Sequence, residues 1–294
     1  MRIDLLFVRL TAHAPLVIGC IFAAFFVIER VMPLRNRTAG SFARLMVNLA
    51  LTTLAFLAAA ALVKPAALRT FEWNARNEFG MLQLISMPDW ARFIAGFLLL
   101  DLSFYYWHIV NHKVPVLWRF HNVHHIDTDL DVSTGFRFHF GEVLLSAFFR
   151  VAQIRLIGVS FGAFAAYELI FQANTLFHHS NVRLPIALER LLNRVLVTPR
   201  MHGIHHSQIR RETNSNFGVV FCWWDKLHRT IGLNIPQSEI TIGVAGYSSR
   251  EDRRLLRALA LPFRKQRDYW SARDGTIPTR DAATLKENRM RLAE

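Results

Sequence analysis

Four apolar stretches organise the chain, and each is long enough for a helix that crosses a membrane. They cover residues 14–32, 45–63, 91–110 and 143–179. Because about 20 mostly apolar residues cross the hydrocarbon core of a bilayer, residues 143–179 are long enough for two passes, with Gly158 as the turn between them. Arg150 and Arg155 make the first half of this stretch a short or interfacial helix. The pattern predicts an all-α, integral membrane, multi-pass protein with four or five hydrophobic helices.

Polar and apolar residues are more mixed after Thr198, which predicts a helical cap of short helices and loops rather than a further membrane segment. We therefore expect three parts. Residues 1–90 form N-terminal transmembrane helices, residues 91–235 a catalytic domain, and residues 236–294 a basic C-terminal tail.

Composition and charge support a membrane protein and exclude a nucleic-acid reader. Hydrophobic residues make up 52% of the 294 residues, and 24 are Phe. The net charge of +13 is not interleaved with aromatic residues in a nucleic-acid-binding pattern. Arg35, Arg37 and Arg44 lie in the first short loop without an acidic residue, which favours a cytosolic position for that loop. The N-terminus is then outside, while the cap, the candidate site and the C-terminus are cytosolic.

Histidine is the residue type that carries candidate chemistry. Eleven of the 13 histidines fall between His108 and His206. His108 and His112 are four residues apart, so on a helix they share one face and can bind one metal ion. The triplets HNVHH and HGIHH repeat this spacing, and the two adjacent histidines in each diverge by about 100° around a helix. Adjacent histidines are therefore expected to serve neighbouring metal ions.

The number of clustered imidazoles predicts two metal ions. Eight or more exceed what one tetrahedral or octahedral ion uses, and without a metal their buried ring nitrogens would be costly to satisfy. A lone histidine at a membrane surface is more simply a half-buried polar aromatic, which is the interpretation we give His13 and His228. Imidazole binds iron, zinc, copper and nickel alike, so the spacing does not select the element.

The order of these motifs resembles that of the fatty acid hydroxylase/sterol desaturase superfamily. HIVNH is followed by HNVHH, RFH, FHHSN and HGIHH, and then by NFG and WWDKL, over roughly residues 101–230. The resemblance implies a membrane-bound di-iron oxygenase that hydroxylates or desaturates a C–H bond of a lipid, with O2 as co-substrate. It also implies an external electron donor such as a reductase, ferredoxin or cytochrome, and zinc can replace the two iron ions in recombinant material.

The resemblance also assigns metal ligands residue by residue. The boxes contribute eight of them, and His139 matches a further histidine of the family between the second box and the next helix. His178 and His179 compete for one more position. The candidate ligands are His108, His112, His121, His124, His125, His139, His178, His179, His202, His205 and His206.

Five polar residues are expected to support these ligands. Asp101 lies two helical turns before His108, and Glu142 lies three residues after His139, so either carboxylate is a candidate to orient an imidazole; helix packing and a helix N-terminal charge are the alternatives. Glu168, Gln172, Thr175 and His179 form one polar stripe on an apolar helix, which favours His179 over His178 as a ligand. Asn174 stands where fatty acid 2-hydroxylases carry a second histidine, which disfavours 2-hydroxylation.

Three rival functions predict different patterns. A membrane zinc hydrolase would place a carboxylate inside a box, as in H-E-x-x-H, and none is present. A metal-binding or transport protein would place its ligands near the bilayer midplane, whereas these boxes follow the end of a hydrophobic segment. A di-haem cytochrome would pair histidines across helices instead of clustering them.

Overall fold

The computed structural model describes residues 2–38 and 41–280, and the side chains of residues 13–38 and 42–280. Residues 281–294 of the expected C-terminal tail lie outside this range. Helices account for the secondary structure of the described residues, which contain no strand, only isolated β-bridges such as that between Pro33 and Val182. The all-α prediction is confirmed.

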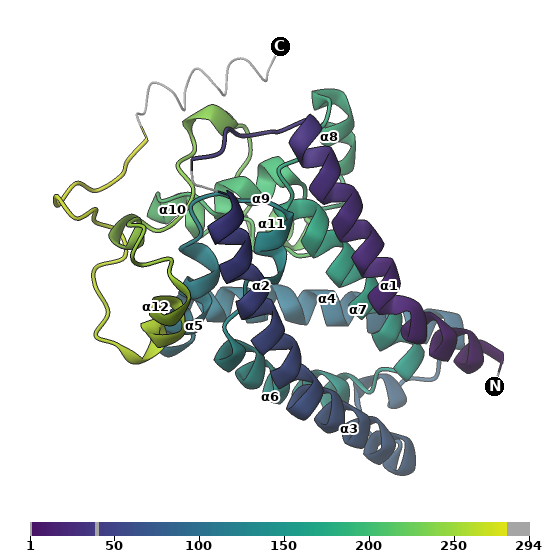
Figure 1. Cartoon of the computed structure of the whole chain (residues 1–294). Coiled ribbons are helices and arrows are strands. Elements are labelled where there is room, and N and C mark those ends of the chain that lie inside the picture. Colours follow the sequence, from purple (N-terminus) through teal and green to yellow (C-terminus); the bar gives the residue numbers. More distant parts are fainter. Residues whose placement is uncertain (1, 39–40, 281–294) are drawn as a thin grey trace.

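Seven helices form the body of the molecule (Figure 1). They are α1 (Arg2–Val31), α2 (Ser41–Ala58), α3 (Lys64–Asn77), α4 (Asp89–Lys113), α5 (Pro115–His125), α6 (Phe140–Ile157) and α7 (Phe161–His179). The π-helical segment η1 (Ala59–Val63) joins α2 to α3 in one continuous helix, so the helix predicted at residues 45–63 extends well beyond its predicted end.

Five short helices follow α7: α8 (Ile186–Leu192), α9 (Pro199–His205), α10 (Arg210–Thr213), α11 (Trp223–Leu227) and α12 (Leu255–Ala260). Single 3₁₀ turns complete the described structure: η2 (Met81–Gln83), η3 (Val132–Phe136), η4 (Gln237–Glu239), η5 (Ala245–Tyr247) and η6 (Leu261–Phe263). In Figure 1, α8 to α11 gather at the end of the molecule where α1 ends and α2 begins, away from the N-terminus. Helices α9 to α12 are short and follow Thr198, while the assignment of this region as a cap stays a prediction.

Helix ends follow local sequence chemistry. Gly158 ends α6 with a left-handed backbone (φ +72°), as predicted for the turn, and the Ser160 hydroxyl accepts the Ala163 N–H at the start of α7. Pro115 and Pro199 occupy the first turns of α5 and α9, where a missing N–H costs nothing. Both histidine triplets therefore lie on helices whose start is fixed by a proline.

Three helical stretches are long and apolar enough to cross a membrane: His13–Val31, Phe42–Gln83 and Asp89–Lys113. They correspond to the first three predicted segments. Helices α6 and α7, which were predicted to form one or two further passes, are not among the candidates found in the described residues. The count of four or five spans stays a prediction.

Buried polar contacts hold α1 and α2 against the loops that follow the histidine helices. The Glu29 carboxylate, at the end of α1, accepts the N–H groups of Val132 and Asn181, each at 3.0 Å. Arg44 on α2 donates to Asp127 at 2.7 Å and also pairs with Asp131. The N-terminal helices thus brace the segments next to the site.

Part of the expected tail is packed rather than extended. Tyr247 and Leu261 belong to one buried cluster with Trp118, Val123 and Ile126 of the α5 region. The ring of Trp270 stacks on that of Trp118, with centroids 6.0 Å apart. Residues 236–280 therefore cover the outer side of α5, while the boundaries at residues 90 and 235 stay a prediction.

Candidate metal centre

Four helices bring nine histidines together at one end of the bundle. These histidines come from the last turns of α4, from the triplets of α5 and α9, and from the last residue of α7. The nine fall into two groups in which every member offers one ring nitrogen within 4.8 Å of the others: His108, His112, His121, His125 and His205 in the first group, and His124, His179, His202 and His206 in the second. All but His112 are buried.

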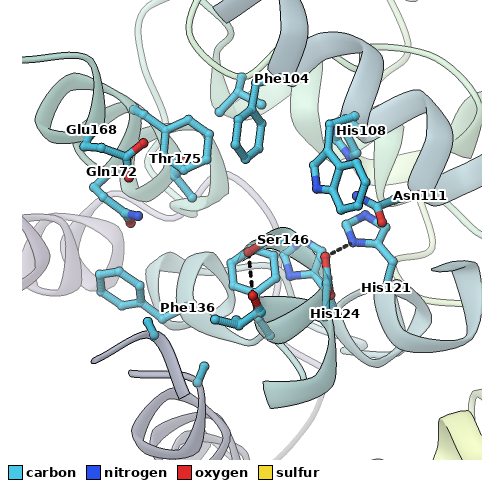
Figure 2. Close-up of a pocket in the computed structure, with 18 of the residues that line it drawn as sticks. Phe104, His108, Asn111, His121, His124, Phe136, Ser146, Glu168, Gln172 and Thr175 are labelled. Carbon is cyan, nitrogen blue, oxygen red and sulfur yellow. Dashed lines mark hydrogen bonds and ion pairs between the residues drawn. The ribbon is translucent and has the colours of Figure 1, made fainter. Parts of the chain in front are cut away.

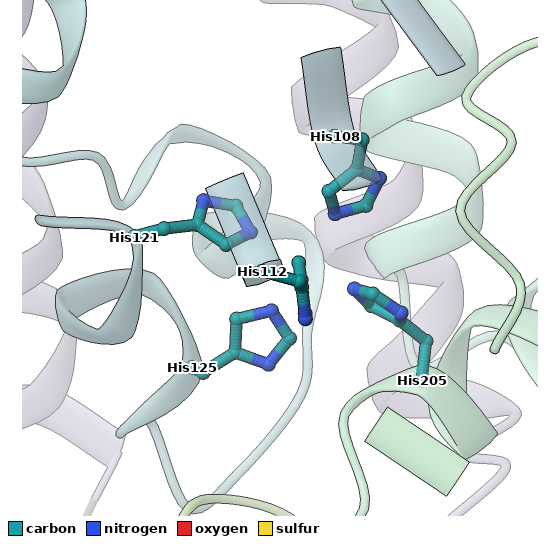
Figure 3. Close-up of side chains that lie close together, drawn as sticks. All are labelled: His108, His112, His121, His125 and His205. Atoms are coloured by element: carbon teal, nitrogen blue, oxygen red, sulfur yellow. The ribbon is translucent and has the colours of Figure 1, made fainter. Parts of the chain in front are cut away.

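The first group surrounds a common point. Figure 3 shows the rings of His108, His112, His121, His125 and His205 pointing toward one another from α4, α5 and α9. Ring centroids of His108 and His205 are 4.6 Å apart, and those of His112 and His125 are 4.8 Å apart. Ligands from three helices thus converge on a volume that fits one ion.

The ring nitrogens of the second group lie close to one another. The Nε2 atom of His179 lies 3.0 Å from Nε2 of His124 and 3.0 Å from Nε2 of His202, and His202 Nε2 lies 3.1 Å from His206 Nε2. For nitrogen–metal bonds of about 2.1 Å, two ligands at right angles on one ion are about 3.0 Å apart. These nitrogens therefore have the spacing of neighbouring ligands on one metal ion.

The division between the groups follows helical phase. Each pair four residues apart stays in one group: His121 with His125, and His202 with His206. Adjacent histidines separate, so His124 and His125 belong to different groups. The expectation that neighbours in each triplet face different ions agrees with this arrangement.

Hydrogen bonds fix which nitrogen carries the proton in three of these rings. The Nδ1–H groups of His108, His179 and His205 donate to the carbonyls of Phe217 (2.8 Å), Thr175 (2.8 Å) and Ser215 (2.7 Å). A carbonyl only accepts, so Nδ1 is protonated in these three rings. Their Nε2 lone pairs are then directed to the centre.

Burial keeps these imidazoles uncharged. It lowers the pKa of His124, His125, His202 and His206 well below the usual value, and neighbouring imidazoles lower it further. Burial also lowers the pKa of His205 to about 3, against the opposing hydrogen bond to Ser215. Neutral imidazole is the form that binds a metal, so the site needs no proton release from these rings at pH 7.

Unpaired ring nitrogens show that the residues fit metal ions. Seven ring nitrogens of the two groups are buried without a hydrogen-bond partner: Nε2 of His112, His121, His125 and His205, and Nδ1 of His125, His202 and His206. A buried polar atom without a partner costs free energy of about 1–3 kcal/mol. For the Nε2 atoms of the first group, a bound metal ion removes this cost. His202 and His206 instead point Nε2 at the second centre, so their Nδ1 atoms lie on the far side of the ring.

Two predicted ligands lie outside both groups. His139 starts α6: its Nδ1 accepts the Gly141 N–H at 2.9 Å, and its Nε2 donates to the Leu259 carbonyl at 3.1 Å. With both nitrogens used by the backbone, the ring has no lone pair left for a metal. His178 packs beside the second group, with its ring 4.1 Å from that of His202, but it is not a member. Of the competing pair, the structure brings His179 to the centre.

Glu142 is the predicted supporting residue that contacts a ligand. One carboxylate oxygen lies 2.8 Å from Nδ1 of His121, where it accepts the ring proton and leaves Nε2 for the metal. Asp101 does not contact a histidine. It accepts the Trp224 indole N–H at 2.8 Å and the Phe221 N–H at 3.2 Å, so it joins α4 to the cap.

The other three predicted supporting residues lie at different distances from the centre. The Asn174 amide lies 3.4 Å from Nδ1 of His178 and also donates to the Val219 carbonyl. Glu168 instead pairs with Arg150 at 2.7 Å, and Gln172 lines a cavity with it. The polar stripe on α7 therefore runs away from the metal centre rather than along it.

Asp225 supports the site in a way that the sequence analysis did not predict. Its carboxylate accepts the N–H groups of Phe217 and Gly218, each at 2.8 Å. The carbonyl of Phe217 in turn accepts the Nδ1–H of His108. Burial raises the pKa of Asp225, while these hydrogen bonds oppose the shift. The motifs NFG and WWDKL contain both partners, but they do not reveal this link, because the intermediate group is a backbone carbonyl.

A largely apolar cavity of about 230 Å³ opens beside the histidines. Figure 2 shows His108, His121 and His124 on one side, with Phe104, Phe136 and Ser146 along the walls. A metal ion bound in either group would face this cavity, because histidines of both groups line it.

These features define a helical protein with candidate membrane-crossing segments and two all-histidine centres beside an apolar cavity. Residues 93–230 match the family model described as fatty acid hydroxylase, so this part of the chain belongs to that family. The matched region contains all nine histidines of the two groups.

Proteins similar to this chain include lipid-modifying enzymes. An ornithine lipid hydroxylase of Rhizobium tropici is 29% identical over 173 residues, which cover 59% of this chain and 50% of the relative. Cholesterol 25-hydroxylase of Mus musculus is 30% identical over 52% of this chain and 51% of the relative. Alkylglycerol monooxygenase of Homo sapiens is 30% identical over 50% of this chain and 33% of the relative. The matches thus span about half or less of these relatives, and no solved structure matches.

Proposed function

We propose that this protein is a membrane-bound di-iron oxygenase that hydroxylates or desaturates a C–H bond of a lipid. The observation that carries the proposal is the pair of buried histidine groups beside an apolar cavity. The named activities of the relatives, on ornithine lipids, cholesterol and alkylglycerols, support a lipid substrate. Two iron ions, when bound, supply activation of O2 and attack on an unactivated C–H bond.

The protein's own groups position and protect this chemistry. His108, His112, His121, His125 and His205 would hold one ion, and His124, His179, His202 and His206 the other. Glu142 and the backbone carbonyls orient the rings through Nδ1. The cavity walls of Phe104, Phe136 and Phe171 exclude water and bind apolar substrate.

We place the site and the C-terminus on the cytosolic side of the membrane. Arg35 and Arg37 lie in the connection between α1 and α2, and Arg44 lies in the first turn of α2, at the end of the bundle that carries the short helices; short basic loops favour the cytosol. On that side, the cap would receive electrons from a reductase, ferredoxin or cytochrome.

A zinc hydrolase is the alternative that metal analysis separates from an oxygenase. Metal content and Mössbauer spectra should be measured on active protein purified without oxygen. We expect two coupled iron ions per chain. Two zinc ions in freshly made, active protein would contradict the oxygenase; zinc in an inactive recombinant sample would not, since the ligands accept both metals.

Lipid extracts test the reaction itself. Cells that make the wild-type protein should contain a lipid species that has gained one oxygen or one double bond relative to cells that make His124→Ala or no protein. Mass spectrometry of the extracts provides the measurement. If no such species depends on the protein, the proposed activity is wrong.

A further inference from the structure

The apolar cavity has a second polar end, far from the histidines. Arg150 of α6 and Glu168 and Gln172 of α7 line it there. Figure 2 shows Glu168 and Gln172 on the side opposite His108, His121 and His124. The cavity is therefore polar at both ends and apolar between them.

The distance between the two ends follows from the helices. Glu168 precedes His179 by eleven residues on α7, which is about 16 Å at 1.5 Å per residue. Arg150 follows Glu142 by eight residues on α6, which is about 12 Å. Along both helices, the charged pair therefore lies about 12–16 Å from the metal centre, which is comparable to the length of a long acyl chain or a sterol.

The pair is compensated in charge and enclosed by aromatic rings. Arg150 Nη1 lies 2.7 Å from Glu168 Oε1, and the two side chains are 9% and 31% exposed. The guanidinium lies 4.6 Å from the centroid of the Phe104 ring and 5.6 Å from that of Phe171. An ion pair in such surroundings is costly, and well-packed apolar side chains would serve helix packing equally well.

The pair also has unused hydrogen-bonding capacity. Glu168 Oε1 lies 2.7 Å from the guanidinium but takes no well-directed hydrogen bond from it, so the pair can still accept a further donor. A hydroxyl group both donates and accepts, so it can donate to Glu168 and accept from the Gln172 amide or the guanidinium. An anionic group would lie beside Glu168 and a cationic group beside Arg150, so a neutral group fits best.

We propose that Arg150, Glu168 and Gln172 bind an uncharged hydroxyl group at the end of the substrate remote from the oxidised carbon. The substrate is then an amphipathic lipid alcohol, held by its hydroxyl while its apolar part reaches the histidines. This inference rests on the proposed function, since it takes the cavity as the substrate site. It makes the three side chains specificity residues rather than catalytic ones.

Competition binding to zinc-loaded protein in detergent tests the proposal. Zinc has no redox chemistry, so the binding result does not depend on oxygenase activity. Tritiated 1-hexadecanol is the bound probe, and unlabelled 1-hexadecanol, hexadecane and palmitate compete. A sterol and its 3-deoxy analogue form a second matched pair. We expect each alcohol to compete about tenfold better than its partner without the hydroxyl, and better than palmitate.

Variants assign the preference to the pair. Arg150→Met with Glu168→Leu removes both charges together, and the alcohol and alkane should then compete within about twofold of each other. Arg155→Met is the matched control: it removes an exposed arginine of the same helix, which lies over Trp73 and not in the cavity. This control should keep the tenfold preference.

Three results would overturn the proposal. The alcohol and its partner without the hydroxyl could compete equally in both the hexadecanol pair and the sterol pair, or neither alcohol could bind specifically. The third result is a hydroxyl preference that survives in the double variant. If the double variant does not fold, the wild-type comparison alone decides. A hydroxyl preference without any oxidised product would contradict the oxygenase and leave this site standing. An oxidised product without the hydroxyl preference would support the oxygenase and contradict the hydroxyl-binding site.

Discussion

Several histidines of the two groups are oriented by the group that their Nδ1 atom contacts. His108, His179 and His205 donate to backbone carbonyls, and His121 donates to the Glu142 carboxylate. His139 has the same residue type, a similar depth and a position between the boxes, but the backbone uses both of its nitrogens. The role of a histidine in this protein therefore depends on its free lone pair rather than on its burial.

Two alanine variants separate these roles. His206→Ala removes one of four ligands in the second group, so we expect purified protein to retain about one metal ion per chain instead of two. His139→Ala should retain both ions, with a stability loss of about 1 kcal/mol from the start of α6. Metal content by mass spectrometry and thermal melts provide the measurements. If His139→Ala loses a metal ion, His139 is a metal ligand and this account of its role is wrong.

The turn between α6 and α7 sets how these two helices align along the cavity. Gly158 takes φ +72° and packs against Gly80 at the end of the α3 region. A Cβ at Gly158 would lie 2.9 Å from the Cα of Gly80 and 3.0 Å from the carbonyl oxygen of Phe79. The turn therefore needs glycine for both its backbone conformation and its space.

Gly158→Ala should destabilise the protein through both effects. A left-handed alanine costs about 1–2 kcal/mol, and backbone displacement adds to that, so the melting temperature should fall by roughly 4–8 °C. Gly19→Ala is the control, since a Cβ there meets nothing within 4 Å and alanine favours the helix. Equal melting temperatures of Gly158→Ala and wild type would refute this account of the turn.

The described part of the molecule is built around buried polar groups that metal ions would satisfy. Nine imidazoles from four helices converge, and several ring nitrogens are buried without partners. Because the unfolded chain does not hold these ligands together, binding favours the folded state. The metal centres are therefore expected to stabilise the packing of α4, α5, α7 and α9.

Chelation should lower the stability of the whole protein. A ligand at a thousandfold excess over its Kd stabilises by about 4 kcal/mol, which corresponds to roughly 8–16 °C in melting temperature for a chain of this size. Melts in detergent before and after metal removal, followed by metal addition, measure the effect. The double variant His112→Ala/His206→Ala should respond far less to chelator. A wild-type melting temperature unchanged by metal removal would show that the fold does not depend on metal.

Local sequence patterns were enough to predict the helical class and the turn at Gly158, and they singled out the histidines that converge in the structure. Hydrophobic segment length and helical spacing are local properties, and the four-residue spacing of His108 and His112 already places both on one face. Helical phase also indicated that His124 and His125 diverge, which they do. These results follow from the geometry of a single helix.

Which histidines come together depends on the tertiary structure. Bringing His205 to His108 and His179 to His124 depends on how four helices pack, and no spacing within one helix contains that information. Carbonyl partners such as those of Phe217 and Ser215 are invisible in sequence because every residue has the same carbonyl. The pairing of Glu168 with Arg150, rather than with a ligand, likewise arises where two helices meet, since a side chain's partner is set by what packs opposite it.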